Sequence, residues 1–171
     1  MVGLLFVRDD REYVLEPGET LETDLGVLEV PETVEPGDVV ETHLGDVFDV
    51  RSLRIPDCFE HFERTGAPML PRDIGLILGE TGAGTGDNVL DVGTGTGVLA
   101  AALGQAGASV ITYERDADFA AVARSNMQLA GVADRVDVRE GDALDALAAL
   151  DQRFDVVTLD TEDAPRIAEA V

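Results

Sequence analysis

The pattern of hydrophobic and polar positions changes near residue 88, and the two parts of the chain predict different structures. After that point, short apolar runs bounded by Gly or acidic residues alternate with longer stretches rich in Ala and Leu. Short bounded runs are typical of buried strands, whereas the longer stretches have the length of helices. Such alternation predicts a parallel sheet with helices on both faces. The expected strands are 88–91, 110–114, 136–138 and 154–160, and the expected helices are 98–106, 116–130 and 143–150.

Residues 1–55 have shorter apolar runs with frequent turn signals. Two Pro-Gly pairs, Pro17-Gly18 and Pro36-Gly37, mark tight turns, because Pro fixes φ and Gly supplies the corner with positive φ. The runs around them predict about five strands in a small β-barrel-like domain. Short helices at 57–64 and 71–79 then lead toward the parallel sheet. The expected organisation is an all-β domain at 1–55, linker helices at 56–87 and an α/β domain at 88–171.

Three glycines at alternate positions, Gly93, Gly95 and Gly97, separate the first expected strand from the helix that follows. Glycine lets the backbone adopt positive φ and lets a ligand approach the main chain closely, and a helix N-terminus offers free N–H groups beyond such a turn. A Walker A loop is excluded because it needs a Lys, and this chain has no Lys. A dinucleotide-binding fingerprint needs Gly or Ala where this chain has Val98. An ordinary tight turn is the plainer alternative.

Acidic residues occupy the ends of the expected strands. Asp91, Glu114 and Asp160 end the first, second and fourth of them, and Asp142 lies just past the third. Ligands of open parallel sheets bind at the carboxyl ends of the strands, so we expect these four side chains at one edge. Glu114 also follows Gly93 by about 20 residues, the spacing at which an acid reaches a ribose hydroxyl pair. In a chain with 35 acids, any single one could be a solvated strand end, but four beside a glycine turn favour a binding site.

The composition indicates the environment of the protein more clearly than its reaction. The net charge is −23, from 35 acidic residues and 12 basic residues that are all Arg. Acidic, Lys-free surfaces resemble those of proteins from salt-loving organisms, where counterions screen the repulsion, so the charge does not exclude a nucleic-acid partner. No apolar run has the length of a membrane span, and no basic segment precedes an apolar one at the N-terminus. We therefore expect a soluble, cytoplasmic protein.

Residue types that often bind metals are few. Cys58 is the single cysteine, so it has no partner for an internal disulfide, and we expect a buried thiol without a role. No paired clusters of Cys and His occur, so we expect no metal site. His43 stands alone in an expected β-rich region, where a hydrogen-bonded structural role is commoner than a catalytic one.

The motif Asp91-x-Gly93-x-Gly95-x-Gly97 resembles motif I of the class I S-adenosylmethionine-dependent methyltransferases. The chain as a whole resembles one branch of that class, the archaeal and bacterial tRNA (adenine-N1)-methyltransferases that act on adenine 57 or 58 of the T-arm. Segments from both expected domains carry this wider resemblance: Leu21–Gly26, Glu41–Gly45, Pro71–Ile77, Asp118–Ala120 and Asn126–Gly131.

The resemblance implies a class I methyltransferase fold, a Rossmann-like parallel α/β sheet preceded by a small all-β domain, with S-adenosyl-L-methionine as cofactor. It implies that Glu114 holds the ribose hydroxyls of the cofactor and that Asp142 holds its adenine amino group. Asp160 matches the family's catalytic aspartate, which bonds the exocyclic amine of the target adenine and helps with proton loss. Asp91 would lie near the amino group at the methionine end of the cofactor. The implied cofactor-binding residues are Asp91, Gly93, Thr94, Gly95, Thr96, Gly97, Glu114, Arg115, Asp142 and Asp160.

The resemblance also implies partners and shows departures. It implies a tRNA substrate whose target base is flipped from its stack, no membrane, and a homo-oligomer, which is a tetramer in the family. Residues 67–70 replace the family's Gln-x-x-Tyr, and residues 161–165 lack the aromatic that the family often has after the aspartate. Class I sheets have more strands than the four expected here, so the chain is expected to be a C-terminally truncated fragment.

Two other functions are open on the sequence. One is a class I methyltransferase that acts on a protein, as the isoaspartate type does, or on a small molecule. The other is a module that binds S-adenosylmethionine or RNA without catalysis. The β-rich N-terminal domain favours the RNA enzyme over the first alternative, because it offers a docking surface for a macromolecule.

Overall fold

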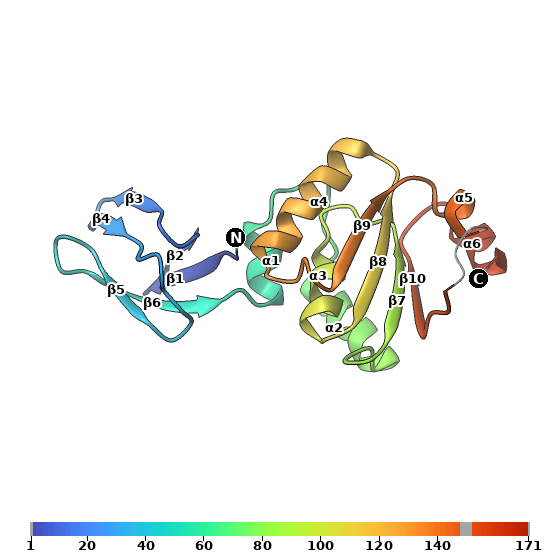
Figure 1. Cartoon of the computed structure of the whole chain (residues 1–171), viewed down its shortest axis with the longest axis horizontal. Helices are drawn as coiled ribbons and strands as arrows, with labels where there is room; N and C mark the ends of the chain where they lie inside the picture. Colours follow the sequence, from blue (N-terminus) through green and yellow to red (C-terminus); the bar gives the residue numbers. More distant parts are fainter. Residues whose placement is uncertain (1, 148–151, 171) are drawn as a thin grey trace. The chain divides into compact units, whose positions relative to one another are not determined.

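The computed structural model describes residues 2–147 and 152–170. The chain divides into two compact units (Figure 1). The first comprises Met1–Arg54 with Gln128–Gly131, and the second comprises Ile55–Met127 with Val132–Val171. The fold class is therefore α/β with an antiparallel β region at the N-terminus, as the sequence predicted.

The first unit is built from short antiparallel strands. Four of them form a sheet in the order β2-β1-β6-β5, and β3 pairs with β4 as a separate hairpin. Its core contains large apolar side chains from both sheets, among them Phe6, Leu28 and Phe48, which are all fully buried. The described strands number six where about five were expected. They are β1 (Leu4–Arg8), β2 (Arg11–Leu15), β3 (Thr20–Thr23), β4 (Gly26–Glu29), β5 (Val39–Glu41) and β6 (Val47–Ser52).

His43 has the structural role that the sequence favoured. Its Nδ1 accepts a hydrogen bond from the Val27 backbone N–H at 2.7 Å. The neighbouring Thr42 hydroxyl donates to the Leu25 carbonyl oxygen at 2.8 Å. Both bonds join the chain after β5 to the β3–β4 hairpin, so this segment fixes the hairpin against the sheet.

The second unit contains a four-stranded parallel sheet in the order β10-β7-β8-β9. All four expected strands and the three expected helices are present, although residues 148–150 of the last expected helix lie outside the described part of the chain. One further helix, α6, was not expected. The strands are β7 (Asn88–Val92), β8 (Ser109–Glu114), β9 (Val136–Glu140) and β10 (Val156–Leu159). The helices are α1 (Ile55–His61), α2 (Pro71–Thr81), α3 (Val98–Gln105), α4 (Ala117–Leu129), α5 (Ala143–Leu147) and α6 (Ala164–Ala170).

Helices cover both faces of this sheet (Figure 1). On one face, Leu90 and Ile111 pack with Ala143 of α5 and Ile167 of α6 in a common core. On the other face lies α3, whose residues from Val98 to Gly104 are all buried. Alternate strand residues thus point to opposite layers, as a sheet buried on both sides requires.

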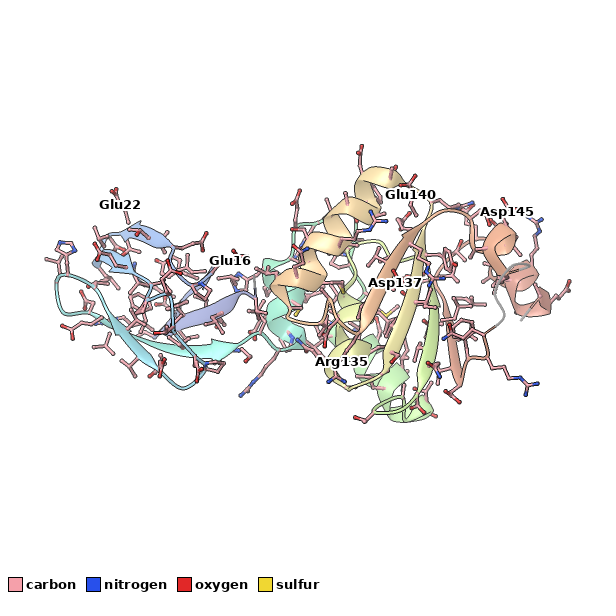
Figure 2. The ribbon with its side chains drawn as sticks, viewed as in Figure 1. Glu16, Glu22, Arg135, Asp137, Glu140 and Asp145 are labelled. Atoms are coloured by element: carbon pink, nitrogen blue, oxygen red, sulfur yellow. The ribbon has the colours of Figure 1, made fainter. Side chains whose placement is uncertain are left out.

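The strand β9 forms one edge of the described sheet. Its inward residues Val136 and Val138 are buried, while Asp137 is exposed. Figure 2 shows Asp137 and Glu140 along this strand, and Arg139 bonds Asp137 at 2.8 Å. Charged side chains of this kind discourage pairing with another strand at a free edge.

Cys58 is a buried, free thiol, as expected. It is 1% exposed, and burial, followed by the nearby Asp57 carboxylate, raises its pKa to about 12. A thiol with so high a pKa is not a nucleophile at neutral pH. In the part of the chain that the structure describes, the helices are too short or too polar to cross a membrane.

Candidate functional site

The glycine turn between β7 and α3 is the centre of the candidate site. Gly93 has a φ of 95°, and a Cβ there would collide with the carbonyl oxygen of Asp160. Gly97 has a φ of 85°, and a Cβ there would lie 2.7 Å from the Met127 methyl carbon. At Gly95 a Cβ would meet no atom within 4 Å. Gly93 and Gly97 therefore let the turn fit the protein, whereas Gly95 borders open space where a ligand can approach the main chain.

Backbone hydrogen bonds hold this turn against the end of β8. The N–H groups of Gly93 and Thr94 both donate to the Tyr113 carbonyl oxygen, at 3.0 and 3.3 Å. The Gly95 N–H donates to Oε2 of Glu114 at 2.9 Å. The other carboxylate oxygen, Oε1, accepts the Asp116 N–H at 3.1 Å. Each carboxylate oxygen has a further lone pair, so Glu114 is held in one orientation and can still accept bonds from two ligand hydroxyls.

A cavity of about 390 Å³ opens at the carboxyl ends of the strands, within the usual range of small-molecule sites. Glu114, Asp142 and Asp160 all line it, so three of the four expected acids come together. Arg115 lines it as well, and its guanidinium pairs with Asp163 at 3.2 Å. With Glu162, five acids and one Arg surround this cavity, and that balance favours a ligand that carries positive charge.

Asp142 lies where the chain passes from β9 into α5. Its Oδ1 accepts the Leu144 N–H at 2.8 Å, which caps the first turn of the short helix. The preceding Gly141 donates its N–H to the Glu114 carbonyl oxygen at 2.8 Å. The Leu144 N–H therefore orients the carboxylate of Asp142, which lines the cavity.

Asp160 follows the last residue of β10 and lines the cavity together with two neighbouring hollows. Its N–H donates to the Val92 carbonyl oxygen at 2.9 Å, which fixes its backbone beside the glycine turn. A hollow of about 50 Å³ lies between the turn, Asp160 and the segment Ala67–Met69. A groove of about 410 Å³, lined mainly by apolar side chains, runs from Asp160 along β10 and α2. Asp160 thus lines the cavity, the hollow and the groove.

Asp91 does not occupy the position that the sequence predicted. It is the fourth residue of β7 rather than the last of the strand, and it is 2% exposed. Its carboxylate accepts hydrogen bonds from the hydroxyls of Thr158, at 2.6 Å, and Thr112, at 2.7 Å. Burial raises the pKa of Asp91, and the two hydroxyls act in the opposite direction. Asp91 is absent from the residues that line the cavity; it joins β7 to both neighbouring strands instead.

The same buried network reaches Thr94 in the glycine turn. The Thr94 and Thr112 hydroxyl oxygens lie 2.5 Å apart. A hydroxyl donates only one hydrogen bond, and Thr112 donates to Asp91. Thr94 must therefore donate to Thr112, so its hydroxyl points into the protein. Thr94 contributes to the site through its position in the turn and not through its hydroxyl.

Thr96 is likewise occupied by the protein. Its Oγ1 accepts the Thr65 N–H at 3.4 Å, and its carbonyl oxygen accepts a bond from the Asn126 amide at 2.9 Å. Both bonds connect the turn to residues far away in the sequence. Thr96 lines the smaller hollow beside Ala67 and Pro68.

Several residues of the cavity were not found from the sequence. Phe119 is 38% exposed and contributes an aromatic ring, and Ile167 of the unexpected α6 lines the apolar side. The sequence does contain a signal for the Thr112 and Thr158 hydroxyls that bind Asp91, because each threonine is a polar residue between apolar residues of its strand. The strand register places both beside Asp91. In residues 2–147 and 152–170, no group of three or more His, Cys, Asp or Glu side chains is arranged to hold a metal ion.

Comparison with known proteins adds a family to this geometry. Residues 89–168 match the model of a methyltransferase domain. The tRNA (adenine(57)-N(1)/adenine(58)-N(1))-methyltransferase of Methanocaldococcus jannaschii is 32% identical over 157 residues, which cover 89% of this chain and 52% of that protein. The protein-L-isoaspartate O-methyltransferase of Koribacter versatilis is 47% identical over 72 residues, which cover 42% of this chain and 31% of that protein.

A solved structure shares the fold over almost the whole chain. It is the S-adenosylmethionine-dependent O-methyltransferase of Thermotoga maritima, with a TM-score of 0.75 and 25% identity, covering 99% of this chain and 66% of that one. The chain spans about half the length, or less, of the two curated relatives. These proteins agree on methyl transfer and differ in the methyl acceptor.

Proposed function

Because this chain carries a class I methyltransferase domain, whose cofactor is S-adenosylmethionine, we propose that it methylates N1 of adenine in the T-arm of tRNA, at position 58, 57 or both. The observation that carries the proposal is the place of Asp160, which borders both the cofactor-sized cavity and the hollow across the glycine turn. The similarity to the Methanocaldococcus jannaschii enzyme, over 89% of this chain, supports tRNA as the substrate.

The described residues fit the cofactor. Glu114 presents two carboxylate oxygens that backbone N–H groups already orient, which suits the two vicinal hydroxyls of a ribose. Gly95 borders open space and has no side chain to exclude the methionine end. Asp142 can accept a bond from the adenine amine, and Arg115 lies next to Glu114 on the same wall. The excess of acids complements a cofactor that carries a positive sulfur.

When bound, S-adenosylmethionine would supply an electrophilic methyl group on a positively charged sulfur, with a neutral thioether as the leaving group. The protein has to hold the acceptor in line with that methyl group, and positioning of this kind lowers the barrier substantially. Asp160 would accept a hydrogen bond from the exocyclic amine of the adenine. Its negative charge would also stabilise the positive charge that the ring gains as N1 takes the methyl group.

The target base has to leave its stack to reach Asp160. The hollow beside Ala67–Met69 and the apolar groove that begins at Met69 both share Asp160 with the cofactor cavity. Apolar side chains there, such as Leu76 and Leu99, would contact the flipped base or its neighbours. The protein is proposed to act on tRNA as a homo-oligomer, and light scattering at high KCl would test its assembly.

A second candidate is methyl transfer to oxygen, on an isoaspartyl protein or on a small molecule. Two observations favour it: the identity of 47% to the Koribacter versatilis enzyme and the fold shared with the Thermotoga maritima enzyme. A hydroxyl acceptor on a small molecule needs a base that takes its proton, and Asp160 could act in that role; an isoaspartyl carboxylate is already deprotonated and needs no base. The acceptor therefore has to be decided by assay.

The test is methyl transfer from labelled S-adenosylmethionine, at high KCl, to an unmodified tRNA transcript and, separately, to an isoaspartyl peptide. We expect N1-methyladenosine in the tRNA, identified by mass spectrometry, and no product from the peptide. The variant Asp160→Asn keeps the shape and removes the charge; it should lower kcat by about a hundredfold or more while leaving cofactor affinity nearly unchanged. Product from the peptide alone would favour the second candidate, and cofactor binding without any product would indicate a binding module.

A further inference from the structure

The side chain of Asn126 joins three separate segments of the second unit. It lies on α4 and is 2% exposed. Its Nδ2 donates to the carbonyl oxygens of Glu63 and Thr96, both at 2.9 Å. Its Oδ1 accepts the Glu63 N–H at 3.2 Å. One buried amide thus binds helix α4, the segment before α2 and the glycine turn to one another.

The orientation of this amide follows from its partners. Two carbonyl oxygens can accept only from an N–H, and the Glu63 N–H can donate only to an oxygen. The opposite orientation would place the amide oxygen against two carbonyl oxygens and leave all three groups unsatisfied. Because buried polar groups without partners are costly, the amide is held in this one arrangement.

The segment that Asn126 holds leads into the wall of the smaller hollow. Thr65 gives that segment a second connection to the turn, since its N–H donates to the Thr96 hydroxyl at 3.4 Å. Two residues later the chain reaches Ala67, Pro68 and Met69, which line the same hollow as Asp160. The chain here is neither helix nor strand until α2 begins at Pro71. Its position therefore depends on side-chain contacts such as those of Asn126.

The glycine turn is fixed by more bonds than this segment. It keeps the backbone bonds from Gly93 and Thr94 to Tyr113, and the bond from Gly95 to Glu114, when Asn126 is removed. The loss of Asn126 would consequently affect the segment at 63–69 more than the turn.

We infer that Asn126 is a positioning residue that holds the segment 63–69 in a fixed position against the glycine turn. The methyl acceptor is then confined beside Asp160 once the cofactor occupies the turn. Asn126 touches neither the cofactor nor the acceptor in this role. The inference rests on the proposed methyl transfer for its effect on the reaction, whereas its structural part concerns the protein alone.

Three variants separate hydrogen bonding from packing. Asn126→Ala removes the whole amide. Asn126→Asp keeps the volume but replaces a donor of two bonds by a carboxylate oxygen that faces two carbonyl oxygens. Ser125→Ala changes the exposed neighbour on the same helix and serves as the control. If packing alone mattered, Asn126→Asp would behave like the wild type.

The first measurement is amide hydrogen exchange by mass spectrometry on the protein without ligand. We expect peptides that cover 63–69 to exchange about tenfold faster in Asn126→Ala and Asn126→Asp, the factor of one net hydrogen bond, with no change in Ser125→Ala. Unchanged exchange in either folded Asn126 variant would overturn the inference. This result does not depend on the acceptor, so it stands apart from the test of the proposed function.

The second measurement compares cofactor affinity with turnover of the tRNA transcript. We expect the Kd for S-adenosylmethionine to stay within about threefold of wild type, because the turn keeps its bonds to Tyr113 and Glu114 when the bond to Asn126 is lost. The kcat/KM for tRNA should fall by about tenfold or more, because the segment at 63–69 is no longer held in place. An equal fall in cofactor affinity and in kcat/KM for tRNA would overturn the inference, since it would make Asn126 a part of the cofactor site. If Asn126→Ala does not fold, Asn126→Asp decides both measurements.

Discussion

Replacing Thr112 by Val tests whether the buried hydroxyl network stabilises the candidate site. Thr112 is fully buried in β8. Its hydroxyl donates to Asp91 at 2.7 Å and accepts from Thr94 at 2.5 Å. Valine has almost the same shape as threonine, so Thr112→Val creates no cavity and removes only the two hydrogen bonds. The change therefore isolates the polar contribution of this one group.

The magnitude follows from the two groups that lose a partner. A hydrogen bond to a charged group contributes about 1.5–3 kcal/mol, and a buried neutral group left without a partner costs about 1–3 kcal/mol. Thr158 still donates to Asp91 at 2.6 Å, which limits the loss at the carboxylate. We therefore expect Thr112→Val to lower the free energy of unfolding of the second unit by roughly 2–5 kcal/mol, a large part of the stability of an ordinary domain.

The assay has to isolate the second unit, because a chain with two compact units need not unfold in one step. Hydrogen exchange of amides in β7 and β8, measured at high KCl, reports the opening free energy of that sheet directly. Thr85→Val, at an exposed position, is the matched control. A loss below about 0.5 kcal/mol, the usual range of surface substitutions, would refute the network. In the background of Asp91→Asn the loss should shrink, since the bond to a charge is no longer there.

Three further predictions concern the same site. Burial raises the pKa of Asp91 above its ordinary 3.8, so the folded protein binds this proton more tightly than the unfolded chain does. The free energy of unfolding therefore falls as pH rises from about 4. In Asp91→Asn this fall should disappear. Opening free energies from hydrogen exchange of amides in β7 and β8, measured at a series of pH values, check this, and an unchanged slope would contradict it. Glu114→Ala should weaken S-adenosylmethionine binding by roughly ten- to a hundredfold in calorimetry, through the loss of charge-assisted bonds. The exposed Asp145→Ala (Figure 2) should bind like wild type, and equal affinity in all three proteins would place the ribose elsewhere. Gly93→Ala should cost at least about 1–3 kcal/mol of stability because its φ is 95° and a Cβ meets Asp160. Gly66→Ala, where a Cβ meets nothing within 4 Å, should be nearly neutral. Hydrogen exchange of amides in β7 and β8 compares the two variants.

Much of the second unit could be predicted from the order of residues. The strands and helices from Asn88 to Leu159 follow from the alternation of apolar runs with Gly and acidic stops, because burial on both faces of a parallel sheet leaves a local trace in the sequence. The rule that ligands bind at the carboxyl ends of strands then placed Glu114, Asp142 and Asp160 at one cavity, where the structure has them. Their roles toward the cofactor and the acceptor stay predictions.

Other features depended on which side chains meet in space. The sequence shows that Asp91 precedes the glycine turn, but its carboxylate faces Thr112 and Thr158 because the register of three parallel strands brings those residues to its level. In the same way, Asn126 and Glu63 are 63 positions apart in sequence. They form hydrogen bonds only because the packing of α4 turns the Asn126 side chain toward Glu63. Periodicity determines which face of an element is buried. It does not determine which polar group on that face meets which partner, because this depends on strand register and helix packing between segments that are distant in the chain.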